Sequence, residues 1–240
     1  MEKKIFYEEI KRKGENIDID FSVEQMDKLY RYMEILIEWN EKMNLTAITE
    51  PNEIILKHFI DSLTILKEIK TGNKVVDVGT GAGFPGIPLS IMNENIEMFL
   101  VDSLNKRLVF LDNVSRELNL KNISIIHSRA EDFGKDKRYR EQFDIAVSRA
   151  VANLSTLSEY LVPLIKIGGK CVCMKASDAE EEINQAKKAI NVLGGTIKNI
   201  EKFNLPESDI GRTVITIIKE KNTPNKYPRK AGIPSKDPIK

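Results

Sequence analysis

The stretch Lys74-Val75-Val76-Asp77-Val78-Gly79-Thr80-Gly81-Ala82-Gly83-Phe84-Pro85-Gly86 decides the fold of this 240-residue chain. A short β-branched run carries a carboxylate and then opens into alternating glycines. Such a run is typical of a buried parallel strand, and the glycines let the loop backbone come close to a ligand. Gly86 and the apolar residues that follow it predict a helix. The first N–H groups of a helix in this position suit a nucleotide-like ligand.

A dinucleotide is the first candidate for that ligand. The six residues from Gly81 satisfy the G-x-G-x-x-G fingerprint, and Asp102 follows at about the distance expected for a ribose contact. However, the fingerprint should begin directly after the strand, at Gly79, and in that register Phe84 occupies the place of a required glycine. Pro85 also lacks the N–H that a pyrophosphate would use. The loop therefore fits a dinucleotide poorly.

S-adenosylmethionine (SAM) is the second candidate. It has no pyrophosphate, but it carries an amino group, a sulfonium and a carboxylate. Asp77, two residues before the first glycine, suits such a ligand and has no evident role in a dehydrogenase. Asp77 has a second possible role, which is to hold loop N–H groups together. We therefore expect SAM as the cofactor, with a nicotinamide-dependent Rossmann oxidoreductase as the alternative.

The rest of the chain predicts an α/β fold with a doubly wound sheet. Strands are expected at about 74–78, 97–101, 122–127, 143–148 and 169–175, and helices at Asn105–Leu118, Asn153–Leu164 and Asp178–Leu193. This alternation predicts a parallel sheet. The segment between Thr196–Phe203 and Thr213–Lys219 is too short for a helical crossover, so these two strands should form an antiparallel hairpin. A parallel sheet that ends in such a hairpin is typical of the Rossmann-like SAM-dependent methyltransferase fold.

Ligands of such sheets bind beyond the carboxyl ends of the strands. Asp102 ends the second strand and is expected to accept hydrogen bonds from ribose hydroxyls. After the third strand, Ala130 and Glu131 are expected to contact the adenine edge. Arg149 ends the fourth strand, where enzymes that methylate exocyclic amines usually carry an Asn/Asp-Pro-Pro-aromatic motif, which is missing here. Both cysteines fall inside the fifth strand, so neither is placed as the nucleophile of a pyrimidine-C5 methyltransferase.

Six motifs in one order resemble the RsmG (GidB) family of bacterial 16S ribosomal RNA guanine-N7 methyltransferases. They are Asn44-Leu45-Thr46, His58-Phe59-Ile60-Asp61-Ser62, the Asp77–Gly86 loop, Asp102-Ser103-Leu104-Asn105-Lys106-Arg107, Ser148-Arg149-Ala150 and Tyr227-Pro228-Arg229-Lys230-Ala231-Gly232-Ile233-Pro234. The resemblance runs from about Asn40 to the C-terminus. It implies 16S ribosomal RNA or the small ribosomal subunit as the partner. It also implies that Gly79, Phe84, Ala130, Glu131 and Arg149 contact the cofactor; Gly81 is expected to do so because the alternating glycines let the backbone approach a ligand.

A guanine N7 acceptor would need little chemical help from the protein. N7 has a free lone pair in the major groove, so direct in-line transfer from the sulfonium requires no general base, and alignment carries the catalysis. Arg149 is the candidate for positioning, as part of the site or as half of an ordinary ion pair. Candidates for RNA contact are Lys106, Arg107, Lys175, Arg229 and Lys230. A Rossmann-like RNA-binding module without catalytic activity is a further alternative.

Charge is distributed unevenly along the chain. The net charge is +1, yet residues 219–240 hold seven Lys or Arg and two Asp or Glu, so the remainder is slightly acidic. A basic tail punctuated by prolines predicts an extended arm whose side chains reach RNA phosphates. The alternative is a solvated tail that aids solubility. The two strand cysteines predict a reducing, cytoplasmic environment, and we expect no membrane span and no metal site.

We expect three regions along the chain. Residues 1–68 form a helical region packed on the sheet, residues 69–220 the methyltransferase domain, and residues 221–240 the basic tail. Within the first region, Ser22-Val23-Glu24-Gln25 is a capping box that should open a helix to about Asn40, and Pro51 suits the first turn of the next helix. His58 is interpreted as a hydrogen-bonded core residue, and the protein as a monomer.

Overall fold

Seven strands form the central sheet of the protein, and the computed structural model describes all 240 residues. The strands are β1 Lys74–Val78, β2 Glu97–Asp102, β3 Ile123–His127, β4 Phe143–Arg149, β5 Ile165–Ala176, β6 Gly195–Asn204 and β7 Gly211–Lys219. Their order is β3-β2-β1-β4-β5-β7-β6. Strands β1 to β5 are parallel, and β7 lies antiparallel between β5 and β6. The predicted parallel sheet with a terminal antiparallel hairpin is therefore confirmed.

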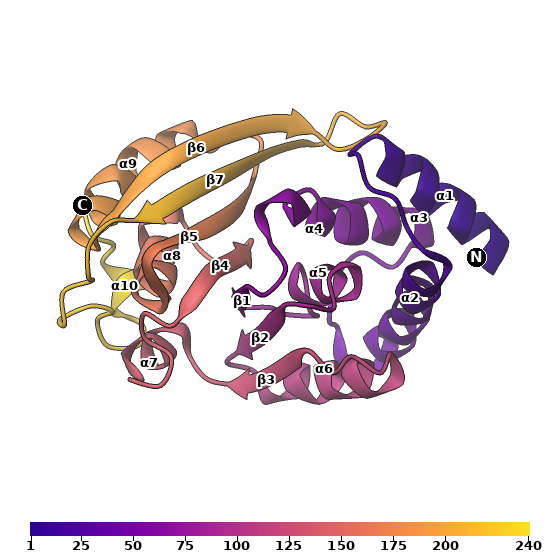
Figure 1. The fold of residues 1–240 in the computed structure, drawn as a ribbon, viewed down its shortest axis with the longest axis horizontal. Helices are drawn as coiled ribbons and strands as arrows, with labels where there is room; N and C mark the ends of the chain where they lie inside the picture. The colour runs from indigo at the N-terminus through magenta and orange to yellow at the C-terminus, as the bar shows by residue number, and fades with distance from the viewer.

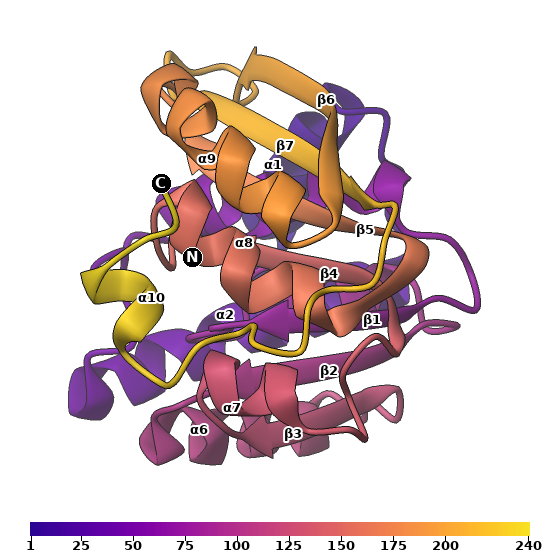
Figure 2. The same ribbon diagram turned by 90° about the vertical axis from the view of Figure 1, so that its left-hand side faces the viewer.

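Helices cover both faces of this sheet (Figures 1 and 2). They are α1 Lys3–Glu15, α2 Val23–Met43, α3 Pro51–Ile54, α4 Asp61–Leu63, α5 Gly86–Met92, α6 Asn105–Glu117, α7 Ala130–Lys135, α8 Leu154–Leu161, α9 Glu180–Val192 and α10 Ile233–Lys236. A π-helical turn at Ile55–Ile60 connects α3 to α4, and short 3₁₀ turns lie at Leu66–Glu68 and Val162–Leu164. Helices α1 to α6 pack on one face of the sheet, and α7, α8 and α9 pack on the other.

The β1 sequence shows why two cores form. Side chains alternate across a strand, so Val75 enters the core beneath α1 to α6, whereas Val76 and Val78 enter the core beneath α7 to α9. All three valines are fully or almost fully buried. A strand with apolar residues on both faces is stable only when helices cover both of them. The faces of the central strand β1 are therefore covered, and a ligand can approach it only from its ends.

The N-terminal helices complete the first core. Ser22 caps α2 as predicted: its hydroxyl accepts a hydrogen bond from the Gln25 N–H at 3.2 Å, and the Gln25 side chain accepts one from the Ser22 N–H at 2.9 Å. Helix α1 lies within the helical region expected over residues 1–68, although no separate helix was predicted before Ser22. Phe6 and Ile10 nevertheless lie one turn apart on its buried face, and both are fully buried.

Two other predictions differ from the structure. The helix expected over Asn153–Leu164 ends at Leu161, because Pro163 has no N–H to continue the α-helical hydrogen bonds. The C-terminal tail is not an extended arm. It runs back over α7 and α8, where Tyr227 and Pro234 are buried, and it ends near the short helix α10. The extended-arm prediction is therefore wrong, because the tail has its own apolar and polar partners.

Candidate active site

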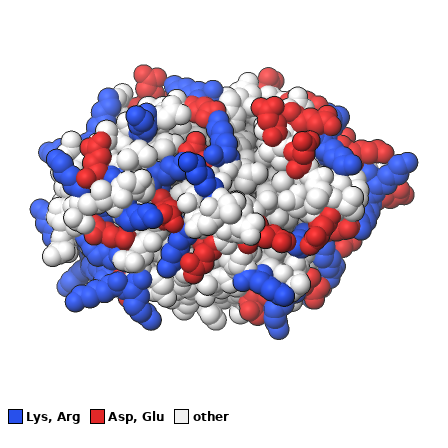
Figure 3. Space-filling view, in the orientation of Figure 1, with Lys and Arg blue, Asp and Glu red and all other residues white.

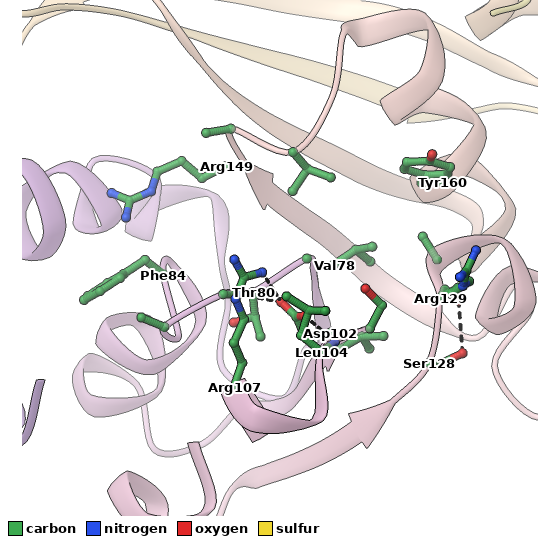
Figure 4. Close-up of a pocket in the computed structure, with 18 of the residues that line it drawn as sticks. Val78, Thr80, Phe84, Asp102, Leu104, Arg107, Ser128, Arg129, Arg149 and Tyr160 are labelled. Carbon is green, nitrogen blue, oxygen red and sulfur yellow. Dashed lines mark hydrogen bonds and ion pairs between the residues drawn. The ribbon is translucent and has the colours of Figure 1, made fainter. Parts of the chain in front are cut away.

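A cavity of about 730 Å³ lies beyond the carboxyl ends of β1, β2 and β4. In Figure 4, Phe84 and Arg149 lie on one side of this cavity, and Arg129 and Tyr160 lie on the other. Asp102 and Arg107 lie between these two groups. The volume is within the range of pockets that bury a small organic ligand. The expected position of the site at the carboxyl edge of the sheet therefore agrees with the structure.

The glycine loop between β1 and α5 forms one wall of the cavity. Gly79 and Gly81 have φ angles of +71° and +62°, which L side chains rarely adopt. A Cβ atom on Gly79 would lie 2.6 Å from Cγ2 of Val151, so that position needs glycine for packing as well. A Cβ atom on Gly81 would meet no protein atom nearer than 4.0 Å. Gly81 therefore leaves open space at the cavity wall, as a ligand approaching the backbone requires.

Asp77 links the two ends of this loop through hydrogen bonds. Its Oδ2 accepts hydrogen bonds from the Thr80 hydroxyl at 2.7 Å and from the Gly86 N–H at 2.9 Å. The residue is fully buried and does not line the cavity, and its Oδ1 has no hydrogen-bond partner. Burial raises the pKa of Asp77 to about 6, although both hydrogen bonds oppose that shift. Of the two roles considered for Asp77, the geometry favours that of tying the loop.

Asp102 lies at the end of β2, next to the cavity. Its Oδ1 accepts a hydrogen bond from the Leu104 N–H at 2.9 Å, and its Oδ2 accepts bonds from the Gly81 N–H at 3.0 Å and from Arg107 at 3.1 Å. A carboxylate has about four acceptor positions, so one remains for a ligand hydroxyl. Arg107, expected to contact RNA, is thus paired with a residue expected to contact the cofactor (Figure 4).

Ala130 and Glu131 begin α7 and line the far side of the cavity together with Tyr160. Glu131 is buried, and one of its carboxylate oxygens accepts a hydrogen bond from the Gly232 N–H at 2.7 Å. Burial raises the pKa of Tyr160 to about 12, and the nearby Glu131 carboxylate adds to the shift. This phenol therefore stays protonated at neutral pH.

Arg149 is held by a buried charge cluster. Its Nη1 donates to Asp61 at 3.1 Å and to the carbonyl oxygen of Lys57 at 2.9 Å. Asp61 also accepts two hydrogen bonds from Arg212, at 2.9 and 3.1 Å. Burial lowers the pKa of the Arg149 guanidinium, while Asp61 opposes that shift. Arg149 is therefore both half of an ion pair and part of the cavity wall.

His58 supports Arg149 from the other side. Arg149 Nη2 lies 3.1 Å from His58 Nδ1, and because Arg can only donate, Nδ1 must accept and Nε2 carries the ring proton. Nε2 then donates to the Thr46 hydroxyl at 2.9 Å. The imidazole also stacks on Phe84, with ring centroids 4.3 Å apart. Burial, followed by the Arg149 charge, lowers the pKa of His58 to about 3, so the ring is neutral at physiological pH.

Two members of this cluster were missed from the sequence. Asp61 follows His58 by three residues, a spacing that places two side chains side by side on a helix. This spacing could have indicated that Asp61 lies in the same cluster as His58. Arg212 lies on β7, 151 residues away from Asp61, and no local pattern indicates that contact. Buried carboxylates are normally paired with a charge, so a buried Asp61 would have predicted a partner without identifying it.

The candidates for RNA contact are in different environments. Lys175 donates to Glu182 at 2.5 Å and to the carbonyl oxygen of Ala152, and Arg229 is paired with Glu159 at 2.7 Å. Lys106 and Lys230 are exposed. The cationic groups of the first two thus already have carboxylate partners, whereas Lys106 donates only to the carbonyl oxygen of Met43, at 3.4 Å, and both exposed lysines are accessible to a polyanion. No group of three or more His, Cys, Asp and Glu residues is arranged to hold a metal ion, and no helix could cross a membrane.

The residues around the cavity fit SAM. The open wall at Gly81, the free acceptor position on Asp102 and the Ala130–Glu131 turn offer close backbone approach and polar groups along one cavity. Solved structures with the same fold include a SAM-dependent methyltransferase from Aquifex aeolicus, with a TM-score of 0.55 and 19% identity, which covers 73% of this chain and 97% of that chain. A pre-rRNA processing fibrillarin from Methanococcus jannaschii matches with a TM-score of 0.51 and 15% identity, and covers 63% of this chain and 69% of that chain.

The fold and the cavity therefore define a Rossmann-like, SAM-dependent methyltransferase. The family model for rRNA small subunit methyltransferase G (GidB) matches residues 25–210. Two relatives carry the name ribosomal RNA small subunit methyltransferase G. The protein from Clostridium tetani is 49% identical to this chain, and the match covers 98% of this chain and 99% of that protein. The protein from Acetivibrio thermocellus is 53% identical, and the match covers 92% of this chain and 91% of that protein. The chain belongs to the rRNA small subunit methyltransferase G family. The predicted family, fold and cofactor are confirmed.

Proposed function

We propose that this protein transfers the methyl group of SAM to N7 of a guanine in 16S ribosomal RNA. The cavity chemistry carries this proposal, because the carboxylates that line the cavity already accept hydrogen bonds from the protein: Asp102 from Gly81, Leu104 and Arg107, and Glu131 from Gly232. The neutral His58 already accepts from Arg149, and Tyr160 stays protonated. Both cysteines are fully buried in β5. An acceptor that needs no deprotonation agrees with such a site.

Guanine N7 is an acceptor of this kind. Its lone pair forms the new N–CH₃ bond while the S–CH₃ bond breaks in line, and the positive charge passes from sulfur to the purine without a proton transfer. When bound, SAM supplies the activated methyl group. The protein then has to align the purine with the methyl group, and alignment alone lowers the barrier by several kcal/mol.

We propose that Arg149 performs this alignment. Its guanidinium donates hydrogen bonds to three protein acceptors, namely the carbonyl oxygen of Lys57, the Asp61 carboxylate and the His58 ring. Of the five N–H donors of a guanidinium, Nε–H and one Nη2–H have no protein acceptor. A donor at guanine O6 distinguishes guanine from adenine, whose amino group has the opposite hydrogen-bonding sense. The remaining Arg149 donors are suited to that contact.

RNA binding itself is proposed for the exposed basic side chains around the site. Figure 3 shows Lys and Arg gathered at the lower left, where Figure 1 places α7 and the C-terminal segment. Lys135, Lys137 and Lys230 are exposed in these segments, and Lys106 is exposed on α6. Because Arg107, Lys175 and Arg229 already have intramolecular partners, we propose weaker roles in RNA binding for them. Bacterial ribosomal RNA is located in the cytoplasm, and we propose the same location for this protein.

Nucleoside analysis tests the proposed reaction. The purified protein is incubated with labelled SAM and either 16S RNA or small subunits from a strain that lacks the family member. Digested RNA should contain labelled 7-methylguanosine. A labelled exocyclic amine or 5-methylcytidine would contradict the N7 assignment. Calorimetry with SAM and with NAD provides the control for an oxidoreductase, which would bind NAD instead of SAM. A module that only binds RNA would give no labelled product.

A further inference from the structure

The chain after β7 is bound to the protein along most of its length. We call residues 223–235 the C-terminal strap. At its start, the two Nη atoms of Arg140 donate to the carbonyl oxygens of Thr223 and Tyr227, each at 2.7 Å. Glu141 accepts a hydrogen bond from the Thr223 N–H at 3.0 Å. These contacts direct the strap across α7 and α8 toward the cavity (Figure 2).

Arg229 is the central anchor of the strap. Its Nε and Nη2 donate to the two carboxylate oxygens of Glu159 at 3.0 and 2.7 Å, and its backbone N–H donates to the same carboxylate at 2.7 Å. Glu159 is fully buried on α8. A buried carboxylate is stable only when it is paired and hydrogen-bonded, so the position of Arg229 is strongly determined. Lys230, the next residue, is exposed and has no partner.

The strap then reaches the wall of the cavity. The Gly232 N–H donates to Glu131 at 2.7 Å, and the Thr156 hydroxyl donates to the carbonyl oxygen of Pro234 at 2.9 Å. Gly232 and Ser235 line the same cavity as Ala130 and Glu131. The orientation of the Glu131 carboxylate is thus set by a residue 101 positions away. The strap is part of the site and not an appendage to it.

We infer that the C-terminal strap forms one wall of the cofactor site and that Arg229 is a positioning residue for Glu131. The inference rests on the proposed function, because it assigns the Glu131 side of the cavity to the adenosine end of SAM. Docking of the strap closes this end of the cavity and presents the Glu131 carboxylate, while bound cofactor in turn stabilises the docked strap. Deleting the tail should therefore weaken SAM binding, whereas an RNA-contacting arm alone would leave it unchanged.

Two single substitutions with the same change in charge separate these roles. Arg229→Ala removes the anchor, and Lys230→Ala removes an exposed charge from the adjacent position. Calorimetry should show SAM affinity reduced about tenfold or more by Arg229→Ala and unchanged by Lys230→Ala. The Michaelis constant for RNA should change little in Arg229→Ala. Equal loss of RNA affinity in both variants, with unchanged SAM affinity, would overturn the inference and favour the RNA-contacting arm.

Hydrogen exchange on the unaltered protein provides a second test, because Arg229→Ala leaves the buried Glu159 unpaired and can unfold the protein. Saturating S-adenosylhomocysteine should slow exchange of the amides at residues 229–233 and of Ser235, and most of all that of Gly232. The double variant Arg229→Gln/Glu159→Gln removes both charges and should still weaken SAM binding. If the unaltered protein binds SAM but neither result is seen, the strap inference fails. If the unaltered protein does not bind SAM, the proposed function fails.

Discussion

Replacement of Asp77 by Asn should stabilise the protein at alkaline pH. Asp77 is fully buried, its Oδ1 has no partner, and burial raises its pKa from 3.8 to about 6. A raised pKa means that the group favours folding below pH 3.8 and that this contribution is lost as the pH rises through 6. The difference corresponds to roughly 3 kcal/mol. The Asn oxygen can still accept from Thr80 and Gly86, so we expect Asp77→Asn to be about 1–3 kcal/mol more stable at pH 8.

Urea unfolding of both proteins between pH 4 and pH 8 measures this effect. The stability advantage of Asp77→Asn should shrink as the pH falls through 6 and vanish below pH 3.8, where Asp77 is protonated in both the folded and the unfolded protein. Calorimetry with SAM at pH 8 serves as the functional readout, and binding should weaken because the loop loses a negative charge below a cationic ligand. A variant that is less stable than the unaltered protein by the same amount at every pH would refute this prediction. In that case the buried charge of Asp77 would not be what lowers the stability of the unaltered protein at high pH.

The other predictions concern the cavity wall and the charge cluster. Gly81→Val should abolish SAM binding, because its side chain would enter the open space of the cavity and a φ of +62° adds backbone strain at this position; a folded variant with normal affinity for SAM would contradict the assigned wall. Arg149→Ala should lose most methyl transfer yet stay folded, since Arg212 still pairs with Asp61; unfolding, with full activity in the folded fraction, would make Arg149 structural. Asp61→Ala should destabilise the protein by about 3–5 kcal/mol in urea unfolding, because the partly buried Arg149 and Arg212 both lose the buried carboxylate that pairs with them. In the Asp77→Asn background, stability should fall by about 1.4 kcal/mol per pH unit from 6.5 towards 3, as His58 protonates first in the unfolded chain; a flat profile would place His58 outside the core.

Part of the candidate cofactor site could be predicted because its determinants are close in sequence. The strand ending in Val78 and the alternating glycines specify a strand, a tight loop and a helix within about a dozen residues, and the parallel sheet places Asp102 and Arg149 at the same edge. The carboxyl ends of the parallel strands meet whatever the side-chain packing is. That topological rule predicted Ala130 and Glu131 near the same ligand, the family resemblance added Phe84, and all three line one cavity.

The support of that site could not be predicted in the same way. Arg212 pairs with Asp61 across 151 residues, and the Gly232 N–H reaches Glu131 across 101. The basic residues of the tail showed a charge balance, but not that Arg229 would be paired inside the protein. Composition counts charges without their partners. Only burial determines whether a cation is free for RNA or required by a carboxylate.

The sequence by itself determined the fold class, the family and the cofactor loop, because hydrophobic periodicity, capping residues and glycines act over a few neighbouring residues. It also placed the antiparallel hairpin, since a short connection leaves no other pairing. The tertiary structure alone decided that Asp61, His58 and Arg212 hold Arg149, and that the C-terminal strap closes the cavity. The physical reason is that such contacts join segments far apart in the chain, and their partners are set by which groups become buried together.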